Sequence, residues 1–248
     1  RDTDGRIVTA ADSDRYLLDV HEYVAAVDER HEHDDLDRAV ERALDRDGYD
    51  GLATYLDWGR ERGFHERSSC ASRRVWFDLG PLTAPAVFVP KFVDRSVSVI
   101  ANPDGLLASN AVDCLWVDAP DDPAVGHDTL ERATLGVLNT TATAACMECW
   151  GRTEGAGALQ LMTYELTTLP VPDPLAFSAE TRRAVAAAAD DLLAGDTSAR
   201  DRLDRLVLDA LDTDLTVEAC RAHRTAMVER RVGDGDRSAA PLVLRERE

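Results

Sequence analysis

The side chains that could support chemistry in this sequence are concentrated between residues 67 and 95. This segment holds five cations against two carboxylates, within a chain whose formal net charge is -19. The cations are Arg67, Arg73, Arg74, Lys91 and Arg95. Guanidinium groups bind phosphates and guanine edges, and hydroxyls such as those of Ser68 and Ser69 also contact phosphate. Two interpretations are open: the segment binds an anion, or its arginines pair with carboxylates of the same chain, which charge alone favours.

A net charge of -19 would by itself repel nucleic acid. We interpret this acidity as an adaptation to concentrated salt and not as a sign of the binding partner. Of the 47 acidic residues 32 are Asp, and Lys91 is the only lysine among the 28 basic residues. Short carboxylates hold water and cations, whereas long ammonium side chains expose methylene groups, so this composition is typical of a halophilic organism. The Asp residues are scattered along the chain, which disfavours a dedicated acidic binding module.

No motif for catalysis is present in the sequence. It lacks a P-loop, a G-x-S-x-G, an H-E-x-x-H and a strand-linked G-x-G-x-x-G. Five cysteines at irregular spacing predict no disulfide framework, and the six histidines stand mostly among charged residues. Cys146 and Cys149 form a lone C-x-x-C at the end of a predicted helix. We interpret this pair as buried small residues rather than as a metal or redox site, because a zinc site needs further ligands and a redox thiol prefers a helix start.

Hydrophobic residues make up 44% of the chain, which is enough for a substantial core. No apolar run approaches the roughly 18 residues of a membrane helix, and Arg1-Asp2-Thr3-Asp4 is not a signal peptide. We therefore expect a soluble, cytoplasmic protein with no membrane partner. Because the sequence begins at Arg1 without a Met, we also expect it to be part of a longer protein.

The N-terminal part predicts a hairpin followed by helices. Residues 6–20 consist of two apolar stretches around a polar turn, which indicates a β-hairpin. Apolar residues at i, i+4 and i+8 from Leu36 predict an amphipathic helix. A second helix starts near Leu52 and ends at Gly59 or Gly63.

The middle of the chain is rich in β-branched and aromatic residues in short runs. The predicted strands are residues 75–77, 86–89, 97–100 and 111–117. Turn signals between them favour an antiparallel sheet over βαβ units. A helix over 129–150, a loop over 151–157 and an extended segment over 166–172 are predicted next. Three further helices follow, from Ser178, from Asp196 to Leu211 and from Leu215 to Arg231.

These elements predict an α+β fold in which a central, mostly antiparallel sheet is flanked by N- and C-terminal helices. By composition we divide the chain into residues 1–66, a hairpin and helical segment; 67–177, a β-rich core; 178–232, C-terminal helices; and 233–248, a flexible tail.

The order of several short motifs resembles the target recognition region of adenine-specific DNA methyltransferases. Residues 55–67 fit Y-L-x-x-G-x-x-x-G-[IF]-x-x-R, and Trp76-Phe77 fit the W-[YF] that follows. The succession continues through Pro90-Lys91, Arg95, Asn102 and Ser109-Asn110, then Leu138-Asn139-Thr140, the loop at 155–157 and Leu169-Pro170-Val171-Pro172. The resemblance covers roughly residues 16–172. Thr140 stands where the family has Ser, and Ala156 interrupts its glycine run.

The resemblance implies a specificity domain whose catalytic partner domain lies upstream. That domain would bind S-adenosylmethionine and hold the flipped adenine with an [ND]-P-P-[YF] motif, which Asn102-Pro103-Asp104-Gly105 does not match. The chain alone would then have no catalytic or metal-binding residues and no cofactor, while its parent would be an adenine methyltransferase of a restriction-modification or phage-defence system. Double-stranded DNA would be its partner. The expected DNA-binding residues are Arg67, Ser68, Ser69, Arg73, Arg74, Lys91, Arg95, Asn110 and Arg152.

A second hypothesis is an interaction scaffold of a halophile with no nucleic-acid role. It is motivated by the charge of -19 and by the absence of catalytic motifs. It predicts no affinity for duplex DNA at any salt concentration, together with a stable oligomer or a co-purifying partner. A self-contained enzyme is the least favoured alternative, because no residue constellation supports it.

Overall fold

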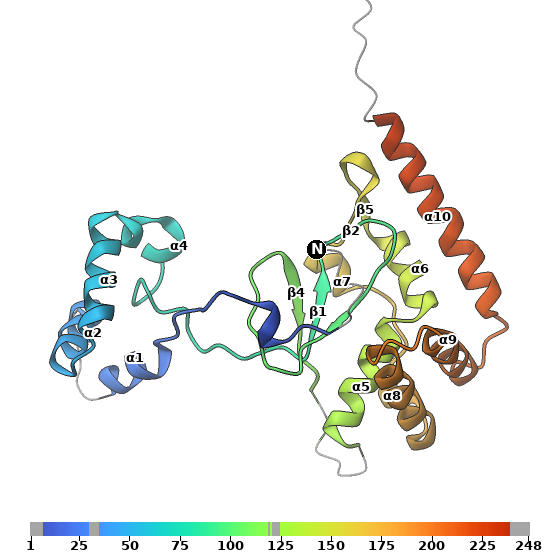
Figure 1. The fold of residues 1–248 in the computed structure, drawn as a ribbon, viewed down its shortest axis with the longest axis horizontal. Coiled ribbons are helices and arrows are strands. Elements are labelled where there is room, and N and C mark those ends of the chain that lie inside the picture. Colours follow the sequence, from blue (N-terminus) through green and yellow to red (C-terminus); the bar gives the residue numbers. More distant parts are fainter. Residues whose placement is uncertain (1–6, 30–34, 119, 121–124, 239–248) are drawn as a thin grey trace, which may run out of the picture. The chain divides into compact units, whose positions relative to one another are not determined.

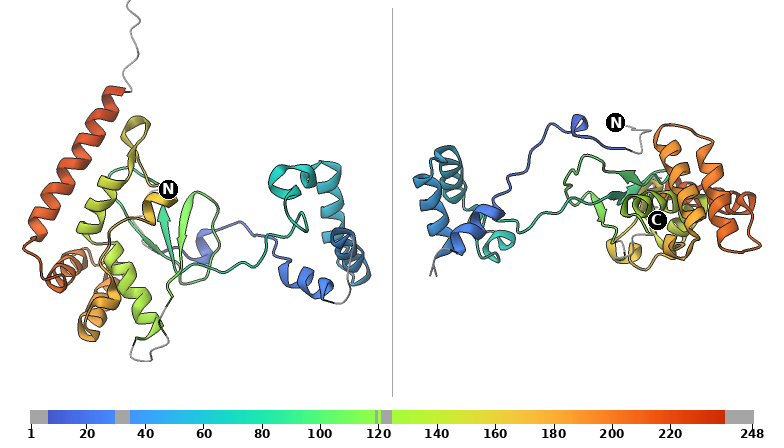
Figure 2. Two further views of the ribbon diagram at one scale, coloured as in Figure 1. Left: turned by 180° about the vertical axis from the view of Figure 1, so that it is seen from behind. Right: turned by 90° about the horizontal axis from the view of Figure 1, so that it is seen from below.

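The structure is a computed structural model that describes residues 7–29, 35–118, 120 and 125–238 (Figures 1 and 2). By contacts the chain divides into residues 14–83, called the helical unit below, and residues 1–13 with 84–248, called the sheet unit. Each unit is described by itself. The four ranges expected from composition are 1–66, 67–177, 178–232 and 233–248, and their limits differ from those of these two units. The division into four domains remains a prediction.

The helical unit contains the two helices that its apolar spacing predicts. Its helices are α1 His21–Asp28, α2 Leu36–Arg46, α3 Asp50–Glu61, the 3-10 helix η2 Phe64–Glu66 and the short α4 Ser68–Ala71. The side chain of Asp35 caps α2 by accepting from the backbone N–H of Arg38 at 3.1 Å. Gly63, at φ +69°, adopts the left-handed conformation that stops the chain after α3. Of the two stops that the sequence offered, Gly63 is therefore the correct one.

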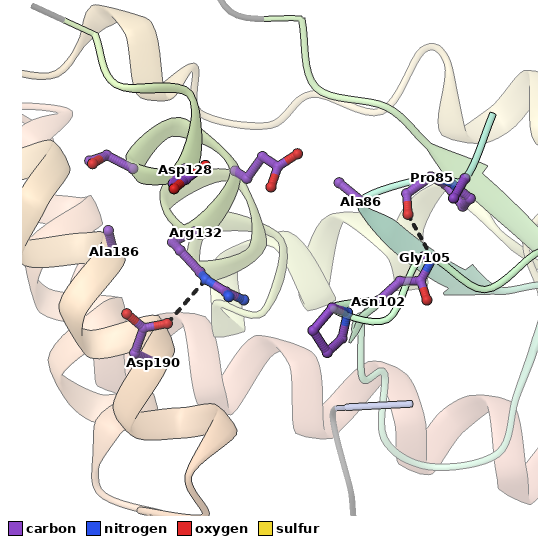
Figure 3. Close-up of a pocket in the computed structure, with 12 residues that line it drawn as sticks. Pro85, Ala86, Asn102, Gly105, Asp128, Arg132, Ala186 and Asp190 are labelled. Carbon is purple, nitrogen blue, oxygen red and sulfur yellow. Dashed lines mark hydrogen bonds and ion pairs between the residues drawn. The ribbon is translucent and has the colours of Figure 1, made fainter. Parts of the chain in front are cut away.

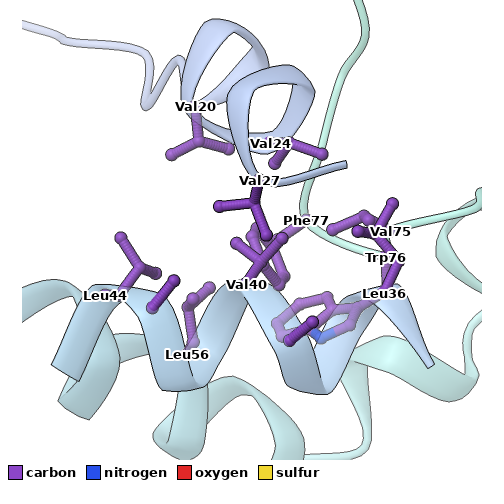
Figure 4. Packing of buried hydrophobic residues seen from close by; sticks show 12 residues of the cluster. Val20, Val24, Val27, Leu36, Val40, Leu44, Leu56, Val75, Trp76 and Phe77 are labelled. Atoms are coloured by element: carbon purple, nitrogen blue, oxygen red, sulfur yellow. The ribbon is translucent and has the colours of Figure 1, made fainter. Parts of the chain in front are cut away.

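The core of this unit joins the three longer helices to residues 75–77 (Figure 4). The sequence predicts a strand at 75–77, and this is wrong: the three residues form a buried turn. The backbone N–H of Trp76 donates to the carboxylate of Asp37 at 3.1 Å, not to a neighbouring strand. Its ring packs so closely on Gly59 that a Cβ there would come within 2.7 Å of a ring carbon.

The predicted hairpin at residues 6–20 is also not formed. Ile7 makes an isolated parallel bridge with Ala101, and residues 10–12 form the 3-10 helix η1 Ala10–Asp12. Residues 14–20 run without a strand partner, although they include the apolar stretch Tyr16-Leu17-Leu18. Alternation alone does not make a strand, because its backbone groups need a partner.

The sheet unit holds two small antiparallel sheets. In the first, β1 Val87–Pro90 pairs with β3 Ile100–Ala101 on one side and β4 Val112–Leu115 on the other. In the second, β6 Leu159–Gln160 lies between β2 Phe92–Val93 and β5 Arg152–Thr153. The predicted strands at 86–89 and 111–117 are thus confirmed, the first shifted by one residue and the second with shorter limits.

Helices flank these sheets and confirm the α+β class (Figure 1). They are α5 His127–Leu138, α6 Thr141–Trp150, η3 Gly155–Gly157, α7 Thr163–Leu166, η4 Pro174–Ala176, α8 Ala179–Leu193, α9 Ala199–Ala210 and α10 Val217–Ser238. One core lies between the strands and α5 and α6, and a second joins α5, α8 and α9. Ser178 caps α8 through its hydroxyl, as its position before the apolar run predicts.

Asn139 explains two differences from the predicted elements. Its buried amide accepts from the N–H of Val99 at 3.1 Å and donates to the carbonyl of Val99 at 3.0 Å. Val99 is therefore paired to a side chain, and of the predicted strand 97–100 only Ile100 joins the sheet, where β3 continues to Ala101. The predicted helix 129–150 is divided at Asn139, and Thr140 caps α6 by accepting from the N–H of Thr143.

Two limits in the C-terminal part also differ. Leu166 ends α7 and Thr167-Thr168 form a turn, so the predicted extended segment 166–172 begins only at Leu169. The last helix runs past Arg231 to Ser238, so the predicted tail at 233–248 begins in a helix and its remainder, 239–248, lies outside the described residues. None of the helices in the described ranges is both long and apolar enough to cross a membrane.

Candidate nucleic-acid interface

The helical unit carries a hollow of about 340 Å³ on its surface. We call it the aromatic hollow and define it by Tyr55, Trp58, Phe64, Arg67, Ser69 and Arg73, which all line it. The side chains come from α3, η2, α4 and the turn after α4. A volume of this size is within the range of small-ligand sites, so the hollow can receive a group as large as a ring.

Three aromatic rings give the hollow its shape. Tyr55 and Trp58, three residues apart on α3, have ring centroids 5.6 Å apart and planes inclined by 21°. Phe64 meets Trp58 edge to face, with centroids 5.3 Å apart. Tyr55 is 57% exposed and Trp58 39% exposed, unlike the core residue Trp76. Aromatic faces that remain in water on a folded domain are available to a flat partner.

Three arginines beside these rings have no ion-pair partner. Arg62 lies over the Trp58 ring at 5.3 Å and Arg67 over the Phe64 ring at 4.3 Å. Arg73 lines the same hollow and is exposed. Across the described residues, no carboxylate lies within ion-pairing distance of any of the three guanidinium groups, whereas at least nine other arginines form ion pairs. In so acidic a chain, three unpaired guanidinium groups in one place are available for an external anion.

Of the other expected DNA contacts in the helical unit, two lie beside these arginines and are exposed, whereas the third is already paired with a carboxylate. Ser68 and Ser69 are exposed on α4, which follows Arg67 directly. Arg74, by contrast, makes a two-pronged ion pair with the carboxylate of Asp28 on α1. Its guanidinium is thus engaged within the unit, as the interpretation from charge alone predicted for all the arginines.

The four remaining expected contacts belong to the sheet unit. Lys91 and Arg152 are engaged: Lys91 Nζ lies 3.6 Å from Asp113, and Arg152 Nε donates to Glu165 Oε1 at 2.7 Å. Asn110, just before β4, and Arg95, after β2, are exposed. Neither has a side-chain partner among the described residues.

Arg152 stands in a row of side chains on the outer face of the second sheet. It lies opposite Gln160, which lies opposite Phe92, so the three point to the same side. Its guanidinium lies 5.3 Å from the centroid of Tyr164. A hydrogen bond from the N–H of Met162 lowers the pKa of the Glu165 carboxyl, and Arg152 lowers it further. Arg152 therefore holds a carboxylate that is well stabilised.

A larger hollow of about 620 Å³ in the sheet unit has the wrong charge for a phosphate (Figure 3). Asp128, Glu131 and Asp190 line it against the single cation Arg132, whose Nε lies 3.3 Å from Asp190. Asn102 at its edge donates to the carbonyls of Pro85 and Leu106, so this amide holds a loop together.

The cysteines offer no metal site within the described parts of the chain. No group of three or more Cys, His, Asp or Glu side chains there could hold a metal ion. The five cysteines are free thiols. Cys146 is half-buried and Cys149 is exposed, so the prediction that both are buried is wrong for Cys149.

Comparison with known families places the chain in the class of methyltransferase C-terminal domains. The family model described as "Type II methyltransferase M.Eco57I, C-terminal domain" matches residues 21–208 of the 248, and the chain belongs to this family. The match spans both units from α1 to α9 and stops before α10. No match was found among curated proteins or among solved structures. The resemblance to a methyltransferase C-terminal region is thus confirmed.

Sequence reasoning did not select the three rings of the aromatic hollow, Tyr55, Trp58 and Phe64, as functional, nor Arg62 beside them. Tyr55 and Trp58 belong to the motif that carries the resemblance, and their spacing of i, i+3 on a helix was the available signal. Their exposure could not be read from spacing, because the same spacing also suits a core stripe.

Proposed function

We propose that this chain recognises the target sequence in double-stranded DNA for an adenine-specific methyltransferase of a restriction-modification or phage-defence system. The parent protein would act in the cytoplasm of a halophilic organism and would carry the catalytic domain, with its S-adenosylmethionine, upstream of this chain. The chain alone would transfer no methyl group. The observation that carries the proposal is the group of three unpaired guanidinium groups on a domain of a methyltransferase family.

The chemistry of the exposed residues suits two different roles, contact with the DNA backbone and contact with base edges. Arg67, Arg73 and the hydroxyls of Ser68 and Ser69 suit the DNA backbone, which fixes register and orientation. Arginine and asparagine, as at Arg95 and Asn110, suit the edges of guanine and adenine. In about 1 M salt the Debye length is only about 3 Å, so the acidic surface repels DNA weakly and direct contacts decide the affinity. The engaged Arg74, Lys91 and Arg152 would reach DNA only by exchanging their present carboxylate partners.

Methylation mapping tests the proposal. The complete reading frame that contains this chain would be expressed in a host without adenine methylation, and its genome would be sequenced for N6-methyladenine. We expect methylated adenines within one short motif, and none in a control host that expresses residues 1–248 alone. Absence of methylated adenine, or methylation at cytosine, would contradict the proposal.

Direct binding separates the proposal from the scaffold hypothesis. We expect the chain to bind a duplex that contains the mapped motif more tightly than a scrambled duplex, with an affinity that falls as salt rises. Equal failure to bind both duplexes from 0.1 to 1 M KCl, together with a co-purifying protein, would support the scaffold instead.

A further inference from the structure

The aromatic hollow combines features that a phosphate-binding surface alone does not need. A site for DNA backbone requires cations and hydroxyls, which Arg67, Arg73 and Ser69 supply. It does not require an exposed, nearly parallel pair of aromatic rings such as Tyr55 and Trp58. Exposed rings of this size cost free energy in water, so a partner with its own flat apolar face would be favoured there.

The arginines beside the rings are held in place without being neutralised. Arg62 and Arg67 lie against the faces of Trp58 and Phe64, which restricts their side chains but leaves their N–H donors unpaired with carboxylates in the described structure. Arg73 adds a third charge at the same hollow. The hollow therefore matches a ligand that has a flat ring joined to an anionic group.

We infer that the aromatic hollow binds an unpaired nucleotide of DNA, with its base stacked on the Tyr55–Trp58 pair and its phosphate at Arg67 and Arg73. Tyr55 and Arg62 both lie against the Trp58 ring, so the outer face of the more exposed Tyr55 is the open face of this stacked pair, with Trp58 supporting it. A base inside a duplex already stacks on both faces, so only an unpaired base can offer a free face to Tyr55. Such a nucleotide exists in a single strand and in a duplex distorted at one position. The inference rests on the proposed function only in naming DNA as the source of the nucleotide.

Fluorescence anisotropy with the complete 248-residue chain tests this inference. The probes would be a labelled ten-nucleotide single strand, the same strand with abasic sites at every position, a perfect duplex, and that duplex with one bulged nucleotide. We expect the base-bearing single strand to bind about tenfold more tightly than the abasic strand, because only the former can stack a base on the rings; this ratio corresponds to about 1.4 kcal/mol. If the nucleotide comes from a distorted duplex, the chain should bind the bulged duplex more tightly than the perfect duplex. If it comes from a single strand, the affinities for the two duplexes should be equal.

Substitutions locate the site. We expect Trp58→Leu to reduce the affinity for the base-bearing strand to that for the abasic strand, and Trp58→Phe to retain most of it. Trp150→Leu is the matched control, because Trp150 is 42% exposed in the sheet unit and should not contribute. If Trp58→Leu lowers the melting temperature, Tyr55→Ala provides the second measurement, because Tyr55 is the more exposed ring.

Each outcome decides the inference. Equal affinity for abasic and base-bearing strands would leave a phosphate site only and would overturn the stacking of a base. Failure to bind any strand would overturn the inference. Methylation mapping tests the proposed function separately. A clear adenine motif without stacking of a base would support the function and overturn the inference. Stacking of a base without adenine methylation would support the inference and contradict the function.

Discussion

The pairing of individual arginines distinguishes candidate function from structure in this chain. Arg74 and Arg152 each hold a carboxylate, at Asp28 and Glu165, and so contribute to the domain itself. Arg67 and Arg73 belong to the same positively charged segment but have no such partner in the described structure. Composition does not distinguish these four arginines. Their free energies of binding an external anion must differ, because only the two that already form an ion pair must first break it.

The neighbours Arg73 and Arg74 test this distinction. We expect Arg73→Ala to weaken binding of the target duplex by about 5- to 100-fold if it reads a base, or to lower the salt slope by about 0.9 if it binds a phosphate. Its melting temperature should not change. Arg74→Ala should instead lower the melting temperature slightly, because it breaks an exposed ion pair of about 1 kcal/mol or less. Anisotropy and thermal melts measure both, and wild-type binding by the Arg73 variant would remove Arg73 from the site.

Glu165 predicts a dependence of stability on pH. Because the fold lowers its pKa, its contribution is present above the unfolded value of about 4.3 and is lost as pH falls through the folded value. We expect Glu165→Gln to lower the melting temperature at pH 7 and to have a progressively smaller effect as the pH falls through the lowered pKa of the folded wild-type carboxyl. A constant difference between the two proteins across this range would show that the charge of Glu165 does not matter.

At the scale of elements, α10 fixes the loop between β5 and β6. Arg231 on α10 and Glu148 on α6 form an ion pair whose side chains are only 4% and 1% exposed. Arg231 also donates to the carbonyls of Gly157 and Asp94. Gly157 approaches α10 so closely that a Cβ would lie 3.0 Å from the Cα of Val232. This helix lies outside the family match, yet it holds a loop inside it.

Removal of one partner of this buried pair should be costly. We expect Arg231→Met to lower the free energy of unfolding by about 3–5 kcal/mol, because Glu148 would remain buried without its ion-pair partner. The double variant Arg231→Met with Glu148→Leu should recover a large part of the loss. Urea titration measures both, and the exposed Arg230→Met provides the control, with an expected effect below about 0.5 kcal/mol.

The two glycines of α3 allow the effect of close packing to be separated from the effect of helix propensity. A Cβ at Gly59 would lie 2.7 Å from the Trp76 ring, whereas one at Gly51 would meet nothing within 4 Å. We expect Gly59→Ala to destabilise the helical unit by about 1–3 kcal/mol and Gly51→Ala to stabilise it by about 0.4–1 kcal/mol. Denaturation followed by far-UV circular dichroism checks the signs. The same sign for both would mean that helix propensity, and not the contact with Trp76, determines the effect.

At the scale of the whole molecule, each unit forms a core from its own residues. The core of the helical unit runs from Val20 to Phe77 and includes no residue beyond the limits of that unit. The cores of the sheet unit begin at Val87. The family match nevertheless includes the helical unit from residue 21 onward, so both units belong to the matched domain.

The independence of the cores predicts that residues 14–83 fold alone. We expect this fragment, in about 1 M KCl to screen its acidic surface, to show a helical circular dichroism spectrum and a cooperative thermal transition. Dispersed amide signals in its NMR spectrum would provide the control for specific packing. A random-coil spectrum would show that the helical unit needs the sheet unit to fold.

The sequence by itself determined several of the helices and the family. Apolar spacing located α2, α3 and α9, and Ser178 marked the start of α8, because these signals depend only on neighbours in the chain. The ordered motifs that run through Trp76 and Pro172 likewise indicated a methyltransferase C-terminal region, which the family match confirms.

Only the tertiary structure decided which backbone and side-chain groups have partners. Residues 75–77 and Val99 look like strands, but their hydrogen bonds go to Asp37 and to Asn139, which lie about 40 residues away. In the same way Arg74 is engaged by Asp28 while Arg73 is left unpaired, although the two are adjacent and chemically identical. Satisfaction of polar groups by distant residues is a property of packing, and local sequence patterns carry no information about it.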